Sequence, residues 1–201
     1  NDVTNTRTLL HEAIPLTGTI SSGTYGDENI KTFSHGMFES VFDYPFLSSS
    51  ANHVFDITHG YSSNSILSGT TAHIQNSKKI NIYNQMASVL VGHDATGSIQ
   101  DFDQDGNIAS GGQKLKEVFF LNFARLLSKD EIKKDSFRIS FLTGGTPGPL
   151  TRANQITIGD FGGSTSYLVN SPAGEYAVLY TSSATPNANS GVGLLYYQAG
   201  V

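Results

Sequence analysis

Short alternating apolar segments, each closed by turn residues, follow one another through the chain from residue 136 onwards. They occupy residues 137–141, 156–158, 167–169, 176–180 and 192–197. Gly, Pro, Ser or Asn bounds each of them. Alternation places every second side chain on the same face of an extended chain, which is the pattern of a strand with one buried face. The sequence therefore predicts short antiparallel strands that dominate the C-terminal half.

The uncharged polar residues favour the same class of fold. Ser, Thr, Asn and Gly together account for 77 of the 201 residues. Small residues of this kind suit turns and the solvent faces of strands, whereas surface helices prefer Glu, Lys, Gln and Ala. The 12 Phe and 9 Tyr residues supply apolar surface for a core. We therefore expect a folded protein dominated by β structure.

Two segments of the N-terminal half have the spacing of short helices. Residues 35–43 follow a candidate N-cap at Ser34, carry apolar residues at helical spacing and end before Pro45. Residues 79–91 carry an apolar helical face and end before Gly92, which is a suitable C-terminal stop. The sequence thus predicts two short helices, at about 35–43 and 79–91.

Strands are expected in the rest of the N-terminal half. Residues 54–61 alternate and predict a strand, and 16–20 are a weaker candidate. Residues 62–77 are loop-like in composition. Residues 117–127 are ambiguous between a buried strand and a helix, and their solid apolar block favours the strand.

These elements together predict an α+β fold, mainly β, in a single domain over residues 1–201. The last apolar segment runs almost to the final residue without a closing turn. We therefore expect this polypeptide to be a fragment of a longer chain.

The charged residues argue against two kinds of partner. Twelve Lys and Arg against 17 Asp and Glu give a formal net charge of −5. The densest basic groups are the pairs at 78–79 and 133–134, whereas a nucleic-acid binder needs a basic patch. No apolar run approaches the roughly 18 residues of a membrane span. We therefore expect neither nucleic acid nor membrane among the partners. Separately, the lack of Cys excludes disulfides and thiolate metal sites.

One motif indicates metal binding. Asp101, Asp103 and Asp105 stand at alternate positions ahead of a Gly, which is how a calcium loop surrounds a hard cation with oxygen ligands. Asn107 could add its backbone carbonyl. The twelfth position of such a loop is Gly112, where an EF-hand needs a bidentate Glu, so we expect no EF-hand. A looser Ca²⁺ or Mg²⁺ site and a plain solvated turn remain as alternatives, and the solvated turn is favoured.

His53, Asp56 and His59 are the only close group among the histidines that could ligate a metal. On a strand, His53 and His59 share one face whereas Asp56 points to the other, so the three are not expected to converge. We interpret the histidines as hydrogen-bonded residues at the surface or at an interface.

The linear motifs of common enzyme classes do not occur. The sequence contains no G-x-S-x-G elbow, no P-loop and no G-x-G-x-x-G motif. Residues 160–162 read Asp-Phe-Gly, but without the other kinase motifs they predict the end of a strand and a Gly turn. Paired carboxylates of the glycosidase type need no linear spacing and stay open, although the chain has no Trp to stack on sugars. The chain is therefore predicted not to be an enzyme, with no catalytic residues.

Several short phrases occur in a characteristic order between residues 30 and 201. They are INIYNQM at 80–86, LVGHD at 90–94, FDQDGN at 102–107, FLNF at 120–123, KDEIKK at 129–134, SF at 136–137, NSPAG at 170–174 and YYQAG at 196–200. Their order resembles virion structural proteins of marine contractile-tailed phages, especially those of cyanophages. The Ile-Lys-x-x-Ser-Phe turn at 132–137 and the terminal Tyr-Tyr-x-x-Gly also resemble a β-module of phage tail and baseplate proteins, although Asp135 stands where Gly would suit the turn.

This resemblance implies a non-enzymatic structural or assembly subunit of a phage particle, in the tail, baseplate or neck or associated with the capsid. The expected partners are other virion subunits and further copies in a homo-oligomer. The expected location is the virion, assembled in the host cytoplasm. The main alternative is a loop-based module that binds a host surface glycan or an adhesin partner, and a hydrolase with scattered carboxylates is a third class.

Overall fold

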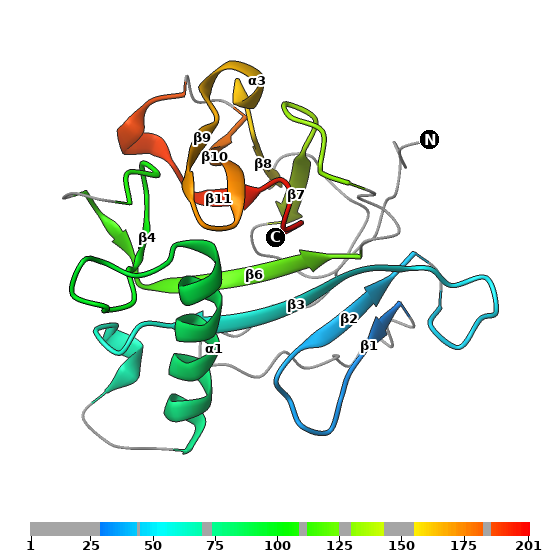
Figure 1. Ribbon diagram of the computed structural model, residues 1–201. Coiled ribbons are helices and arrows are strands. Elements are labelled where there is room, and N and C mark those ends of the chain that lie inside the picture. Colours follow the sequence, from blue (N-terminus) through cyan, green and yellow to red (C-terminus); the bar gives the residue numbers. More distant parts are fainter. Residues whose placement is uncertain are drawn as a thin grey trace. The chain divides into compact units, whose positions relative to one another are not determined.

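The computed structural model describes residues 29–43, 45–69, 74–108, 112–124, 130–142, 155–182 and 186–201. The fold is α+β and mainly β, with antiparallel sheets and two helices, as the sequence predicts (Figure 1). Contacts divide the chain into two compact units. The β3 unit comprises the described residues within Asn1–Met86, Lys116–Asp130 and Gly200–Val201, and the β10 unit comprises those within Ala87–Leu115 and Glu131–Ala199. A single domain over 1–201 stays a prediction.

A four-stranded antiparallel sheet with the order β1-β2-β3-β6 forms the framework of the β3 unit (Figure 1). Its strands are β1 (Ile30–Lys31), β2 (Glu39–Phe42), β3 (His53–Tyr61) and β6 (Glu117–Phe123). The long strand β3 pairs with β2 on one side and with β6 on the other. The core of this unit is a buried cluster with two partly buried neighbours on β6, namely Val41, Val54, Phe55 and Ile57 with Leu121 and Phe123.

Helix α1 (Ile74–Leu90) approaches β3 closely at Gly60. A Cβ atom on Gly60 would lie 2.8 Å from the backbone nitrogen of Tyr83 and 3.1 Å from the carbonyl oxygen of Lys79. Backbone atoms cannot rotate aside, so only glycine permits this approach. The next residue of β3, Tyr61, donates a hydrogen bond from its hydroxyl to Asn76 Oδ1 at 2.9 Å. These contacts hold the first turns of α1 against β3, after the short 3₁₀ turn η1 (Ile66–Ser68).

A second antiparallel sheet, in the order β11-β10-β8-β7, forms the framework of the β10 unit, and β9 pairs with β10. Its strands are β7 (Arg138–Leu142), β8 (Gln155–Gly159), β9 (Leu168–Ser171), β10 (Gly174–Thr181) and β11 (Gly193–Tyr196). The unit also contains the paired strands β4 (Phe102–Asp103) and β5 (Lys114–Leu115), helix α3 (Gly163–Ser166) and the 3₁₀ turn η3 (Ala188–Ser190). Its core is a buried cluster with partly buried neighbours, namely Ala177, Leu195 and Tyr197 with Ile132, Phe137 and Leu179.

Most of the predicted strands are confirmed. Strand β3 matches the alternating segment 54–61, and β6 confirms the strand interpretation of the apolar block within 117–127. Strands β7 to β11 match the alternating segments of the C-terminal half. The weaker candidate at 16–20 lies outside the described residues.

The helix predicted at 35–43 is wrong. Residues Glu39–Phe42 form strand β2, which pairs with β1 on one side and β3 on the other. Met37 and Phe38 are 41% and 36% exposed, whereas Val41 is fully buried. The apolar residues that were expected on one face of a helix are therefore not buried together. Pairing on both sides satisfies the backbone groups of β2, and this tertiary context overrides the local spacing.

The helix predicted at 79–91 is confirmed as α1, but it begins at Ile74, within a stretch assigned to a loop. It ends at Leu90, ahead of Gly92, whose φ of 93° lies in the left-handed region that favours glycine. Neither α1 nor any other helix in the described part of the chain is long and apolar enough to cross a membrane.

Candidate functional site

The Asp-rich motif lies where β4 leads into a turn. Asp103, the last residue of β4, is buried, and its carboxylate accepts a hydrogen bond from the Lys114 ammonium at 2.6 Å. Asp103 Oδ1 accepts the backbone N–H of Asp105 at 3.1 Å, and Asp105 Oδ1 accepts that of Asn107 at 2.8 Å. The pKa of Asp105 is lowered mainly by a hydrogen bond with the Asp103 carboxyl and, to a smaller extent, by the hydrogen bond from the Asn107 N–H. The motif is therefore built around a buried ion pair, and the expectation of a solvated turn is wrong for Asp103.

The Asp103 carboxylate of this turn is already paired with a cationic side chain. No three or more His, Cys, Asp or Glu side chains of the described residues are grouped so that they could hold a metal ion. Lys114 already supplies the positive charge next to Asp103 that a cation would supply. A Cβ atom on Gly112 would lie 2.7 Å from Asp103 Oδ2, so this glycine makes room for the carboxylate. Binding of Ca²⁺ through Asp101, Asp103, Asp105 and Asn107 stays a prediction.

The prediction that His53 and Asp56 point apart is wrong. His53 Nε2 lies 2.8 Å from Asp56 Oδ1, and the Ser40 hydroxyl donates to the same oxygen at 2.6 Å. The register of β2 and β3 shifts beside His53, so strict alternation fails at that point. His59 does not join this group. It is fully buried and has no hydrogen-bond partner, so its interpretation as a hydrogen-bonded surface residue is also wrong.

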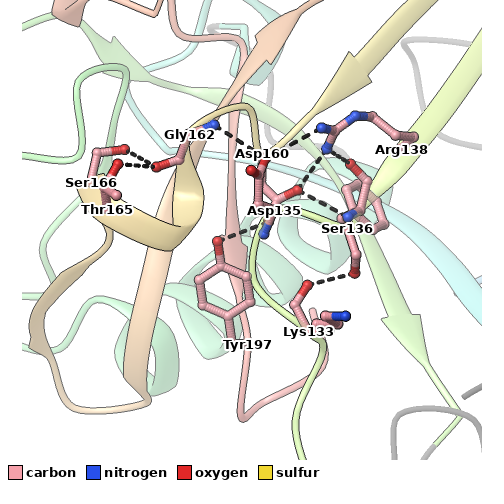
Figure 2. A network of polar contacts seen from close by, with 10 residues as sticks. Lys133, Asp135, Ser136, Arg138, Asp160, Gly162, Thr165, Ser166 and Tyr197 are labelled. Carbon is pink, nitrogen blue, oxygen red and sulfur yellow. Dashed lines mark hydrogen bonds and ion pairs between the residues drawn. The ribbon is translucent and has the colours of Figure 1, made fainter.

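A buried carboxylate follows β8 in the β10 unit. Asp160 Oδ1 accepts hydrogen bonds from the Phe137 N–H and from Arg138 Nη1, both at 2.9 Å. Asp160 Oδ2 accepts the Asp135 N–H at 2.6 Å and the Tyr197 hydroxyl at 2.9 Å. Figure 2 shows Asp135, Arg138 and Tyr197 turned towards Asp160. We refer to these five residues, Asp135, Phe137, Arg138, Asp160 and Tyr197, as the Asp160 corner.

The four donors compensate the charge of a carboxylate that has no exposed surface. Removing an ion of this kind from water costs several kcal/mol unless it is paired and hydrogen-bonded. Arg138 supplies the opposite charge, and its guanidinium lies over the Phe161 ring at 4.0 Å from the centroid. Burial, and after it the hydrogen bond to Asp160, raises the pKa of Tyr197. The Tyr197 hydroxyl is therefore a permanent donor at neutral pH.

The turn that carries two of these donors has an unusual backbone. Asp135 has a φ of 62°, in the left-handed region where glycine is most at ease and where Asp is tolerated. This geometry agrees with the expectation that Gly would suit the position. The Ile132 N–H donates to the carbonyl of Tyr197 at 3.0 Å. The phrases 132–137 and 196–200 are therefore joined directly by this backbone hydrogen bond and indirectly by the hydrogen bonds that both make to Asp160.

The Gly pair after Asp160 is required by close contacts at Gly163 and by the backbone conformation at Gly162. A Cβ atom on Gly163 would collide with the Tyr197 hydroxyl and lie 3.0 Å from Asp160 Oδ2. Gly162 has a φ of 76° and precedes helix α3, and its carbonyl accepts hydrogen bonds from the side chains of Thr165 and Ser166 (Figure 2). The prediction that 160–162 end a strand and enter a Gly turn is confirmed.

The Asp160 corner is suited to holding the chain rather than to chemistry. A general acid, a base or a nucleophile must reach the substrate. Both oxygens of Asp160 are occupied by two donors each, and the residue is fully buried. The arrangement anchors the 132–137 turn to the end of β8 and to the residue that follows β11.

No protein-family model, curated protein or solved structure matches the chain. The resemblance to phage virion proteins therefore depends on the sequence phrases alone.

Sequence reasoning missed the partners of Asp160. In the sequence, Asp160 is marked only as an acidic residue at the end of an apolar segment, directly before two Gly residues. Tyr197 is marked only as a member of the phrase YYQAG. Neither signal tells which donors lie opposite the carboxylate, because hydrogen bonds link Asp160 to residues 22 to 37 positions away.

Proposed function

We propose that the chain is a non-enzymatic structural subunit of a phage particle, which assembles in the host cytoplasm with other virion subunits and with copies of itself. The observation that carries the proposal is the Asp160 corner. It joins the phrases 132–137 and 196–200, on which the resemblance to tail and baseplate β-modules depends. The two phrases thus belong to one hydrogen-bonded feature, as expected of phrases from a single β-module.

The nature of the donors in the corner supports a structural role. Two of them are backbone N–H groups, whose position depends on the shape of the 132–137 turn. The other two, Arg138 and Tyr197, compensate the charge of Asp160 without leaving a reactive group exposed to a substrate. Such a module contributes a fixed surface rather than a reaction.

Exposed large apolar side chains are available for contacts with other subunits. Leu47 and Ile66 in the β3 unit are 88% and 95% exposed, and Val169 in the β10 unit is 68% exposed. Single exposed apolar residues are common on monomers. We infer that neighbouring subunits bury these side chains in the particle, because covering exposed apolar area favours association.

Two measurements test the proposal. Mass spectrometry of purified marine contractile-tailed phage particles should detect peptides of this protein, and size-exclusion chromatography with light scattering should show a discrete oligomer. Val169→Lys should weaken that oligomer, whereas Ser164→Lys, an exposed site on α3, serves as the matched control. A monomer at all concentrations together with no peptides in particles would contradict the proposal, as would hydrolysis of a glycan or peptide that depends on one of the chain's carboxylates.

A further inference from the structure

The loop that joins β1 to β2 presents aromatic side chains that contact one another (Figure 1). The centroids of the Phe33 and Phe38 rings lie 4.9 Å apart, and the His35 ring lies 5.2 Å from Phe33 and 5.0 Å from Phe38. Phe38 is 36% exposed, and the adjacent Met37 is 41% exposed. We refer to residues 31–38 as the aromatic loop. Because its exposed side chains are contiguous, the loop has the character of an interaction surface.

Hydrogen bonds hold the aromatic loop in one conformation. The Gly36 N–H donates to the carbonyl of Phe33 at 2.9 Å, and the Met37 N–H donates to His35 Nδ1 at 3.0 Å. The Thr58 hydroxyl of β3 donates to the carbonyl of Met37. Gly36 has a φ of 62°, which lies in the left-handed region that favours glycine. A loop that is already ordered loses less conformational entropy when a partner covers it, so more of its contact energy contributes to affinity.

The aromatic loop is also locally cationic. It contains Lys31 and no acid, whereas the other 193 residues carry 11 Lys and Arg against 17 Asp and Glu, a formal charge of −6. The Lys31 ammonium lies 5.2 Å from the centroid of the Phe33 ring, so the charge and the aromatic rings belong to one surface. The ion pairs among the described residues do not include Lys31. A well-matched partner should therefore supply an acid as well as apolar contacts.

We propose that the aromatic loop docks onto an acidic surface of a second copy of this chain. The inference rests on the homo-oligomer of the proposed function and names the segment that forms it. Opposite charges favour the contact, because the loop is cationic and the rest of the chain is acidic. Two aromatic loops do not face each other, since two Lys31 ammonium groups would then meet without an acid between them. Met37 and Phe38 provide the apolar anchor, as Met and Phe commonly do in the centre of interfaces.

Carbodiimide cross-linking of the full chain tests the contact directly. The reagent joins an ammonium group to a carboxylate in contact with it, with loss of water. In a mixture of unlabelled and isotopically labelled chains, we expect Lys31 peptides joined to an Asp or Glu peptide of the other label. The acid joined to Lys31 then identifies the receiving surface. An oligomer in which Lys31 is joined only within its own chain, or to no acid, would overturn the proposal.

Light scattering of variants tests how much the loop contributes to the oligomer. Lys31→Glu reverses the charge, and Phe38→Ser removes part of the apolar anchor. Each should raise the dissociation constant by about tenfold or more, as hot-spot substitutions do. Lys78→Glu, at an exposed position of α1, changes the net charge equally and should leave the constant unchanged. Val89→Ser, at a side chain of α1 that is 64% exposed, is the matched control for Phe38→Ser.

The charge reversal keeps the test decisive if Phe38→Ser does not fold. Lys31 is exposed, so circular dichroism should show the native fold in Lys31→Glu. An oligomer that is equally stable in the unchanged chain and in both loop variants would overturn this inference and leave the proposed function intact. A monomer that uses the loop to bind a different virion subunit would overturn it as well. Failure of the proposed function is detected separately, by the absence of its peptides from phage particles.

Discussion

Replacing Tyr197 with Phe removes one hydroxyl from the Asp160 corner and keeps the packing around it. The hydroxyl donates to Asp160 Oδ2 at 2.9 Å, and the ring belongs to the buried cluster with Ala177 and Leu195. Phe retains the ring, so no large cavity forms in the core. The substitution therefore isolates the contribution of one hydrogen bond to a buried carboxylate.

The magnitude follows from the four donors. A hydrogen bond to a charged group contributes about 1.5–3 kcal/mol. Asp160 keeps the donors from Asp135, Phe137 and Arg138, so its charge stays paired and the loss should remain below the roughly 3–5 kcal/mol of a broken buried ion pair. We therefore expect Tyr197→Phe to lower the free energy of unfolding by about 2 kcal/mol, or about 30-fold in the unfolding equilibrium.

Urea unfolding followed by circular dichroism measures this loss, and the slope of stability against urea should be unchanged. Tyr167→Phe is the matched control, because that ring is 39% exposed and its change should stay within about 0.5 kcal/mol. If Tyr197→Phe costs no more than the control, the reasoning is refuted, and the corner does not stabilise the β10 unit.

The remaining predictions concern pH, backbone geometry and metal. Stability should fall as pH rises above about 10, because burial raises the pKa of Tyr176 to about 12 and the unfolded chain releases that proton first; circular dichroism during an alkaline titration measures this. Stability should also fall as pH drops below about 6.5, because burial lowers the pKa of His59 and the unfolded chain therefore takes up the proton first. Urea midpoints at several pH values measure this dependence, which His59→Phe should remove. Asp135→Gly should change the free energy of unfolding by less than about 1 kcal/mol, whereas Asp135→Val should cost about 1–3 kcal/mol in urea titrations, because the φ of 62° suits Gly but not a β-branched residue. EDTA should leave the thermal midpoint unchanged, because Asp103 already has a Lys partner, and a fall of several degrees would favour the Ca²⁺ site.

The elements that are predictable from sequence are those in which the spacing of the apolar residues itself indicates which face is buried. The alternation in 54–61 places Phe55 and Ile57 in the core, and the alternating segments after residue 136 became β7 to β11. Turn residues were equally informative. Gly92 ends α1, the φ of 76° at Gly162 favours glycine, and a side chain on Gly163 would collide with Tyr197.

The elements that were not predictable depend on partners distant in sequence. Residues 35–43 have helical spacing, but β1 and β3 flank Glu39–Phe42 and impose a strand. His59 is expected at a surface, but it is buried and packs against the Phe119 ring of β6, a strand distant in sequence. The burial of Asp103 likewise depends on Lys114 across the β4–β5 pair, which alternate spacing of acids does not reveal.

The order of the Asp160 corner along the chain has a consequence for synthesis. Asp135, Phe137 and Arg138 leave the ribosome before Asp160, whereas Tyr197 follows it by 37 residues. At roughly 5–20 residues per second, that interval lasts roughly 2–7 s. During this interval, β7 of a nascent chain can already pair with β8. The Asp160 carboxylate, however, has only three of its four donors. Tyr197 is synthesised only after β9, β10 and β11. The hydrogen bond from Tyr197 to Asp160 can therefore form only when all strands of this unit have been made. A chain released with β11 unplaced keeps an incompletely compensated charge, opens more readily and exposes itself to proteolysis.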